Sequence, residues 1–351
     1  MLPDFTQKLI DLGLPKLAAA IILFVIGLIL LIKCGDWFVD GASGIAKKFH
    51  VPELLIGATV VSIGTTLPEV MVSAQSAVGG HSQIAYGNAI GSIICNTALI
   101  AALTVAIKPS KVARRSLIVP VLFFFAADAF YSFCAYRFKG FSRKNGIILL
   151  CIFVIYMVVL VMQALKEMKA AKNEIPAEKP LAEGEKPEKE RSIALCIVCL
   201  VIGAAGIAVG ADLLVNNGTI IATSMGVPES VVALTFVALG TSLPELVTAI
   251  TSLAKGHGAL SLGNIVGANL FNLVLVSGLA ITLKPFGVPA DMKIGGQISS
   301  LVVDVPVSLA VMVILTIPTL IRGKLSRFQG ILLLAIYAAF CVYQFAAPGL
   351  L

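Results

Sequence analysis

Long apolar stretches, separated by short segments rich in charged residues, glycine or proline, make up most of this chain of 351 residues. A helix that crosses a bilayer needs about 20 apolar residues. The pattern predicts ten such helices, at residues 17–40, 52–78, 84–107, 116–136, 146–165, 193–222, 228–254, 259–283, 297–320 and 329–347. Of all residues, 58% are hydrophobic and 13% are charged, whereas a soluble domain has about 25% charged residues. We therefore expect an all-α, polytopic membrane protein.

One polar segment differs from the others, residues 166–192 with the sequence KEMKAAKNEIPAEKPLAEGEKPEKERS. It is rich in Lys, Glu and Pro, and a segment of this composition cannot bury a hydrophobic core. We predict a disordered linker that divides the chain into a first half (1–165) and a second half (193–351). Each half then holds five predicted spans.

The distribution of Lys and Arg predicts the orientation in the membrane. These residues are more frequent in the loops after the first, third, fifth, seventh and ninth predicted spans, mainly because of the linker. Loops with an excess of Lys and Arg stay in the cytoplasm. We expect a cytoplasmic linker, both termini outside, and a location in the plasma (inner) membrane. The net charge of +7 is attributed to this orientation, and no nucleic-acid partner is expected.

The two halves contain a repeat. Residues 51–109 align with residues 227–285 at a constant offset of 176, and 21 of these 59 positions are identical. The identities concentrate in Gly, Pro, Asn, Thr and Glu, which membrane helices use sparingly, so chance similarity between apolar helices does not explain them. With five spans per half, the second copy enters the membrane from the opposite side. This inverted repeat is the organisation of secondary transporters, which bind their substrates near the midplane.

Both copies contain the motif Gly-Thr-x-Leu-Pro-Glu, at residues 64–69 and 240–245. Proline removes one backbone hydrogen bond and clashes with the carbonyl four residues earlier, which belongs to glycine in both copies. We expect free carbonyls within 62–65 and 238–241. Lipid cannot satisfy free carbonyls, so these groups would line a polar cavity or bind an ion. A simple helix kink is the alternative, but it would not require an acid in both copies.

The acids of the two motifs, Glu69 and Glu245, would repel each other near the midplane. A divalent cation between them cancels both charges, and calcium takes 6–8 oxygen ligands. Further oxygens are expected from the carbonyls of Thr65 and Thr241, from the hydroxyls of Thr66, Ser242 and Ser92, which suit smaller monovalent ions, and from the amides of Asn96 and Asn272. These motifs contain no Cys or His, which argues against zinc or copper. We expect transported ions rather than a cofactor, and no enzymatic activity.

Other repeated polar residues have less specific interpretations. The Gly-Asn pairs at 87–88 and 263–264 either contribute to the site or satisfy backbone groups at a helix start. His81 and His257 follow glycine in short loops, where we expect loop capping rather than pH sensing. Glu53 and Glu229 are both expected to be first-turn acids favoured by the helix dipole.

The stretches "GTTLPE…GNAIGSIICN" and "GTSLPE…GNIVGANLFN", one in each half, resemble the two alpha repeats of the cation/calcium exchanger superfamily. The resemblance is strongest to its prokaryotic sodium/calcium exchanger branch. It covers both halves and implies ten helices in two inverted five-helix repeats. It also implies an antiporter in which sodium entry drives calcium out, by alternating access between spans 1 and 6 and the remaining eight.

The resemblance implies roles for individual residues. Glu69 and Glu245 would bind calcium directly, as the motif glutamates do in that family. The other residues that would complete the calcium and sodium sites are Thr65 and Thr241 and the carbonyls of Ser62 and Ala238. The hydroxyl of Ser92 would belong to a flanking sodium site, and Asn96 and Asn272 would lie at the centre. Two positions depart from the family pattern: Ala268 lacks the hydroxyl that Ser92 carries, and position 272 is Asn where several exchangers have Asp.

Three alternatives to sodium/calcium exchange remain open. A proton/calcium antiporter of the same superfamily would neutralise the two glutamates with protons. A cation channel would need a continuous pore, which suits an inverted repeat with a central charged cluster less well. A membrane scaffold without transport would not need paired acids. The expected partners are calcium, sodium and the lipid bilayer, and we expect a monomer or a weak homo-oligomer.

Overall fold

The computed structural model describes residues 5–48, 62–109, 111–112, 114–173, 192–254 and 258–346. The first half contains α1 (Phe5–Asp11), α2 (Lys16–Lys48), α4 (Ser62–Thr65), α5 (Leu67–Gly79), α6 (Ser82–Cys95), the π-helix η2 (Asn96–Ala101), α7 (Ala102–Ile107), α8 (Arg114–Phe138) and α9 (Arg143–Asn173). The second half contains α10 (Ile193–Met225), α11 (Glu229–Val232), η3 (Ala233–Val237), α12 (Ala238–Thr241), α13 (Leu243–Ala254), α14 (Gly258–Phe271), η4 (Asn272–Val276), α15 (Ser277–Leu283), η5 (Ser300–Asp304), α16 (Val305–Arg322) and α17 (Arg327–Ala346). The described part of the chain is thus predominantly helical, as predicted.

Eight helices in the described ranges are long and apolar enough to cross a membrane. The predicted spans 52–78 and 228–254 are not among them. The second is divided at Ser242 into a shorter apolar helix, Glu229–Thr241, and α13. The first is divided at Thr66 into α4 and α5, and its first residues lie outside the described ranges. Proline explains both divisions, because it is tolerated in the first turn of a helix but not in its interior.

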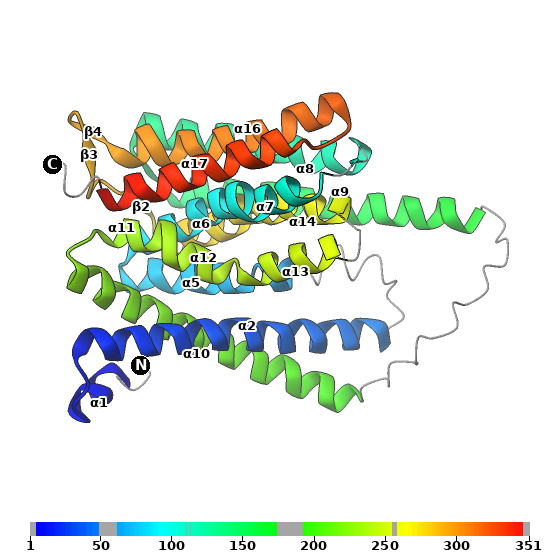
Figure 1. The fold of residues 1–351 in the computed structure, drawn as a ribbon. Helices are drawn as coiled ribbons and strands as arrows, with labels where there is room; N and C mark the ends of the chain where they lie inside the picture. Colours follow the sequence, from blue (N-terminus) through cyan, green and yellow to red (C-terminus); the bar gives the residue numbers. More distant parts are fainter. Residues whose placement is uncertain are drawn as a thin grey trace.

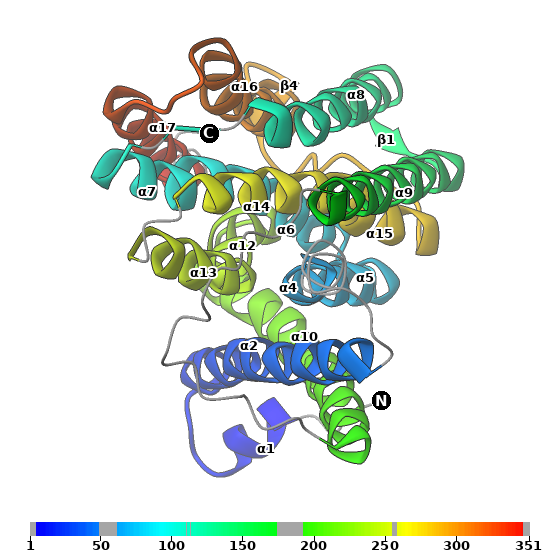
Figure 2. The ribbon, with the colours of Figure 1, turned by 90° about the vertical axis from the view of Figure 1, so that its right-hand side faces the viewer.

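The helices form layers that differ in depth within the molecule (Figures 1 and 2). In Figure 2, α2 and α10 lie together at one side and pack along each other. The broken helices α4–α5 and α12–α13 come next, followed by α6 and α14. Helices α8, α16 and α17 lie beyond α6 and α14, and α9 lies beside α14 and packs against α15. The broken helices therefore lie in the interior, between the α2–α10 pair and the outer helices.

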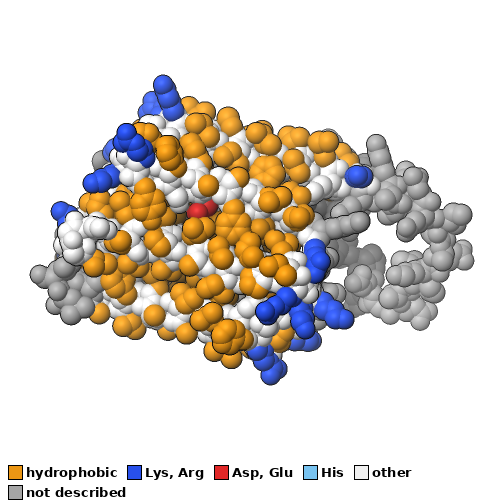
Figure 3. Space-filling view, turned by 90° about the horizontal axis from the view of Figure 1, so that it is seen from above, with side chains coloured by type: hydrophobic (Ala, Val, Ile, Leu, Met, Phe, Trp, Pro, Cys, Tyr) orange, Lys and Arg blue, Asp and Glu red, His pale blue; other side chains and the backbone are white. Residues whose placement is uncertain are grey.

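The surface matches a bilayer environment. Apolar side chains cover the middle of the face shown in Figure 3, and Lys and Arg gather toward its two ends. Large exposed hydrophobic residues occur on the outer helices, for example Leu122 on α8, Val154 on α9 and Ile331 on α17. Exposed apolar surface of this extent is expected where lipid tails replace water.

Two short strand pairs lie at the same end of the molecule (Figure 1). Strand β1 (Gly140–Phe141) pairs with β2 (Phe286–Gly287), and β3 (Lys293–Ile294) pairs with β4 (Gln297–Ile298). The turn between β3 and β4 has two glycines with positive φ, Gly295 and Gly296, as tight hairpin turns require. Helix α9 extends to Asn173, into the segment that we predicted to be a disordered linker. The residues KEMKAAKN are mostly good helix formers, which explains the extension.

Candidate ion-binding site

The two helix breaks bring the predicted acids together. Glu69 lies in the first turn of α5 and Glu245 in the first turn of α13, where the helix dipole favours negative charge. Glu69 is 0% exposed and Glu245 is 7% exposed. The two carboxylates are electrostatic neighbours, and the Ser242 hydroxyl donates to Glu69 Oε1 at 3.3 Å. The interior of the bundle therefore contains a carboxylate pair contributed by both halves.

Glu69 has no basic counter-charge among the described residues. The hydrogen-bond and charge neighbours of Glu69 are Glu245, Ser242, Thr241 and its own backbone, so no Lys or Arg of the described ranges appears among them. Burying two carboxylates costs several kcal/mol per ion unless opposite charge compensates. A bound cation is the direct way to supply that compensation.

Asn88 connects the two halves beside Glu69. Its Nδ2 donates to the Glu69 carbonyl at 3.1 Å and to Ser73 Oγ at 2.9 Å. Its Oδ1 accepts from the Thr241 hydroxyl at 3.0 Å. Asn88 is fully buried, so this network fixes α5, α6 and α12 relative to one another. Asn88 was not among the predicted ligands, and it lies in the middle of α6, so the helix-start interpretation is wrong for it.

Several buried polar atoms have no hydrogen-bond partner within the described ranges. Those on predicted ligands include Glu69 Oε2, Ser92 Oγ, both polar side-chain atoms of Asn96, and Asn272 Oδ1; others lie on Tyr86, Tyr131, Ser132 and Asn269. Leaving such a group unsatisfied costs about 1–3 kcal/mol. Carboxylate, hydroxyl and amide oxygens are the ligands that hard cations prefer. The unsatisfied oxygens thus match the chemistry of sodium or calcium.

The two asparagines begin matching π-helical segments, a feature that the sequence pattern did not reveal. Asn96 is the first residue of η2 and Asn272 the first residue of η4. Segment η2 packs against α13, which carries Glu245, and η4 packs against α5, which carries Glu69. Each asparagine segment therefore lies beside the acid-bearing helix of the other half. Short π-helical segments are frequent at functional sites.

The remaining predicted residues lie along the same breaks. Thr66 and Ser242 are fully buried between the helix pieces, and Thr241 is 1% exposed. Ser62 and Thr65 belong to α4, immediately before the break, but their side chains are outside the described set.

One expectation about the backbone is wrong. The Ala238 carbonyl is not free, because it accepts from the Ser242 backbone N–H at 3.1 Å and from the Thr241 hydroxyl at 3.3 Å. Pro244 has no N–H to donate to the Gly240 carbonyl. The hydrogen bond to the Ala238 carbonyl does not involve Pro244 and is therefore kept.

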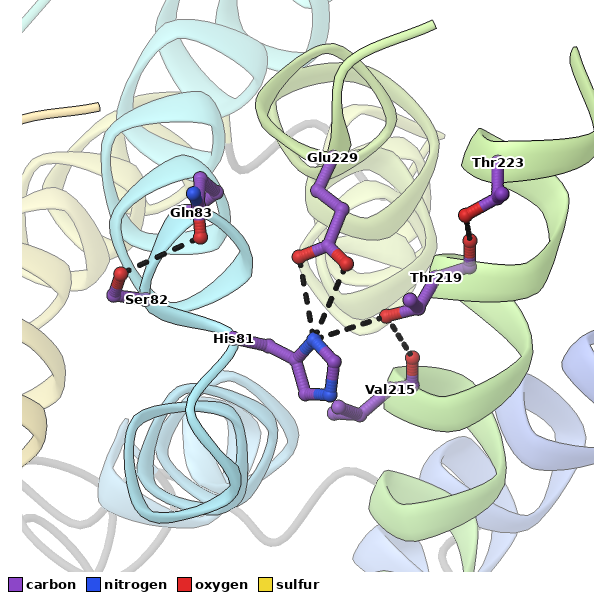
Figure 4. A network of polar contacts seen from close by, with 7 residues as sticks. All are labelled: His81, Ser82, Gln83, Val215, Thr219, Thr223 and Glu229. Atoms are coloured by element: carbon purple, nitrogen blue, oxygen red, sulfur yellow. Dashed lines mark hydrogen bonds and ion pairs between the residues drawn. The ribbon is translucent and has the colours of Figure 1, made fainter. Parts of the chain in front are cut away.

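His81 also differs from the expectation. It occupies the N-cap position of α6 but makes no side-chain capping hydrogen bond. Its ring instead contacts Glu229 and Thr219, which come from α11 and α10 (Figure 4). Glu229 is a first-turn acid, as predicted, whereas Glu53 lies outside the residues that the structure describes. The interpretation of His81 as a loop cap is wrong because the ring turns away from its own helix, and His257 lies outside the described residues.

Comparisons with known proteins identify the family of the chain. Residues 19–162 and 195–346 match the family described as sodium/calcium exchanger protein. The sodium/calcium exchanger MaX1 of Methanosarcina acetivorans is 31% identical over 92% of this chain and 98% of its own length. An uncharacterized membrane protein of Methanocaldococcus jannaschii is 34% identical over 90% of this chain and 94% of its own length. Among solved structures, the sodium-calcium exchanger NCX_Mj soaked with sodium and strontium is similar with a TM-score of 0.57 and 32% identity, covering 91% of this chain and 96% of that one.

Proposed function

This chain belongs to the sodium/calcium exchanger protein family, in the prokaryotic branch of the cation/calcium exchanger superfamily, and from that membership we propose that it exchanges calcium for sodium across the plasma membrane. The observation that carries this proposal is that Glu69 is fully buried beside a second buried carboxylate, Glu245, with no basic group among the described neighbours of Glu69. One calcium ion or several sodium ions would neutralise the pair.

The proposed exchange follows from charge balance. Calcium bound between Glu69 and Glu245 cancels the charge of both carboxylates. Without a net charge, the occupied site can be enclosed in the low-dielectric interior while the protein changes from one open side to the other. Sodium ions replace calcium by using the same carboxylates together with the hydroxyl and amide oxygens around them. If only one carboxylate were neutralised, the site would keep one negative charge, and that charge would oppose the change of the protein from one open side to the other. The predicted ligands Thr65, Thr241, Thr66, Ser242, Ser62, Ala238, Ser92, Asn96 and Asn272 would complete these sites.

The proposed architecture is ten transmembrane helices in two inverted repeats. The α2–α10 pair, whose two helices pack along each other and against the broken helices (Figure 2), would move against the other eight to alternate access. The 166–192 linker would lie in the cytoplasm, and both termini outside. A cysteine introduced near residue 183 tests this orientation, since labelling from the outside of intact cells would contradict it.

The deciding experiment is calcium flux in reconstituted vesicles. Purified protein is placed in vesicles, and calcium uptake is measured under an imposed sodium gradient, an imposed proton gradient, or neither, without potassium. Uptake driven by sodium, and absent from a Glu69→Gln/Glu245→Gln control, supports sodium/calcium exchange. Uptake driven by the proton gradient alone would assign the protein to proton/calcium antiport. Calcium flux that needs no counter-ion would indicate a channel.

A further inference from the structure

We propose that His81, Thr219 and Glu229 form a latch that closes the ion pathway at the end of the molecule opposite the linker, and that breaking this latch is a step of exchange. The inference rests on the proposed exchange function. The latch joins the junction before α6, the helix α10 and the first turn of α11 (Figure 4).

The geometry of the latch fixes its hydrogen bonds. His81 Nδ1 lies 3.2 and 3.3 Å from the two carboxylate oxygens of Glu229 and 3.3 Å from Thr219 Oγ1. A carboxylate oxygen at this distance accepts a hydrogen bond, so Nδ1 carries the proton. The Thr219 hydroxyl donates to the Val215 carbonyl at 3.2 Å and therefore accepts from His81. One imidazole N–H is thus shared between α10 and α11.

The latch lies on the elements that build the ion site. His81 precedes α6, and Asn88 follows seven residues later (88 − 81); Glu229 begins α11, and Thr241 follows twelve residues later (241 − 229). Asn88 and Thr241 are hydrogen-bonded to each other beside Glu69. The latch therefore holds together the near ends of the two segments that meet at the site.

The latch also ties the α2–α10 pair to the rest of the molecule. Thr219 lies near the C-terminal end of α10, about 40 Å along the helix from Ile193 at a rise of about 1.5 Å per residue. In Figure 1, α10 runs from the end of the molecule where α9 ends to the opposite end. Transporters alternate access by moving one bundle against another. If α10 moves, a contact between Thr219 and His81 has to break when this end opens.

Charge gives the latch a measurable signature. Histidine is the side chain that changes charge between pH 5 and 8, and an imidazolium would add charge attraction to the existing hydrogen bond with Glu229. Two other charged groups of the described residues lie near this junction. Lys284 Nζ lies 3.6 Å from a Cβ added to Gly80, and Asp291 accepts a hydrogen bond at 2.7 Å from Ser230, which follows Glu229 in α11. The partner on α10, Thr219, is uncharged, and so are Ser82 and Gln83, which follow His81 and bond to each other. Acid on this side of the membrane should therefore strengthen the latch and slow its opening.

The first test measures sodium-driven calcium exchange in vesicles while the pH is varied in one compartment at a time. From pH 8 to pH 6 on the latch side, we expect the wild-type rate to fall by up to about fivefold, the scale of a partly exposed ion pair. His81→Gln and Glu229→Gln should each remove this fall, and the double variant should resemble either single variant because the two residues share one contact. Thr223→Val is the matched control, because Thr223 lies one turn further along α10 and bonds to the Thr219 carbonyl rather than to His81. It should retain the wild-type profile.

A second measurement does not depend on transport. Hydrogen–deuterium exchange at a single pH should be faster in residues 82–92 and 229–241 of His81→Gln than in Thr223→Val. If the wild type exchanges calcium but His81→Gln keeps both the wild-type pH profile and the wild-type amide protection, the latch is wrong. If amide protection falls in His81→Gln while the wild type transports no calcium, the contact holds and the proposed function is wrong.

Discussion

Helices α6 and α14 contain the same pattern Gly-Asn-x-x-Gly, at residues 87–91 and 263–267, but they pack differently. A Cβ added to Gly87 would lie 2.5 Å from Ala233 Cβ, and one added to Gly91 would lie 2.7 Å from the Leu234 carbonyl oxygen. For Gly263 and Gly267, no heavy atom of the described residues lies within 4 Å of an added Cβ. Helix α6 thus requires its glycines for close packing on η3 and α12, whereas α14 makes no such close approach to the described residues.

The asparagines of the two helices differ in the same way. Asn88 is fully buried and bonded to the opposite half, whereas Asn264 is exposed. A repeated sequence therefore supports two different environments in one structure. This is what an alternating-access transporter needs, because each half has to be able to close on one face while the other half is open.

The largest effect is expected at the acids, where the two halves should be equivalent. Glu69→Gln and Glu245→Gln should each reduce calcium exchange by more than about 100-fold, corresponding to roughly 3 kcal/mol. One carboxylate cannot neutralise a divalent ion in a buried site. Calcium uptake in vesicles measures this, with membrane insertion of each variant as the control. Substantial exchange by either variant would remove that glutamate from the site.

The next effect should distinguish the two asparagines. Asn88→Ala removes hydrogen bonds to the Glu69 carbonyl, Ser73 and Thr241, and at about 1 kcal/mol each the free energy of unfolding should fall by about 3 kcal/mol. Asn264→Ala, the matched control at the exposed position, should change it by less than about 0.5 kcal/mol. Thermal unfolding in detergent compares the two. Equal losses would mean that Asn264 also has buried partners.

A somewhat smaller difference is expected between the second glycines of the patterns. Gly91→Ala would place a methyl group against the Leu234 backbone, and overpacking of this kind costs about 1–3 kcal/mol. Gly267→Ala lacks such a contact among the described residues and should be tolerated. The readout is the unfolding midpoint of each variant against the wild type. A destabilised Gly267→Ala protein with a normal Gly91→Ala protein would reverse the assignment of the packed face.

The sequence predicted the parts of this molecule that depend on local chemistry. A proline followed by a glutamate inside an apolar stretch destabilises a membrane helix unless the break and the charge both serve a binding site. The helix breaks and the two acids could therefore be located from the residues alone. The predicted ligand set as a whole remains a prediction. The helix boundaries were close, and α9 extends further because its last residues favour helix.

Long-range packing was not predictable in the same way. The sequence repeat makes Asn88 and Asn264 equivalent, and only the tertiary contacts of α6 make one of them buried. The His81–Glu229 contact joins residues 148 positions apart, and neither residue indicates its partner locally. The π-helical segments at Asn96 and Asn272 depend on neighbouring helices, since the same residues are compatible with an ordinary α-helix.

The smallest expected effect concerns the one repeat position whose ligand chemistry is unequal. Ser92 has a buried hydroxyl with no partner among the described residues, and its counterpart Ala268 is buried without any side-chain oxygen. If each position flanks the carboxylate pair, the sodium site near Ala268 is one oxygen short. A single weak ligand is worth about 1 kcal/mol, or roughly fivefold in affinity.

Ala268→Ser should therefore lower the sodium concentration needed for half-maximal exchange by about fivefold, and Ser92→Ala should raise it by a similar factor. Calcium affinity should change little in both variants, because calcium relies mainly on the two carboxylates. Calcium efflux from vesicles, titrated with sodium, measures both shifts. An unchanged sodium curve for Ala268→Ser would mean either that water already completes this site or that sodium is not the coupling ion. Calcium efflux measured under imposed pH gradients without sodium separates these two explanations. Only a protein coupled to protons would respond to the pH gradient.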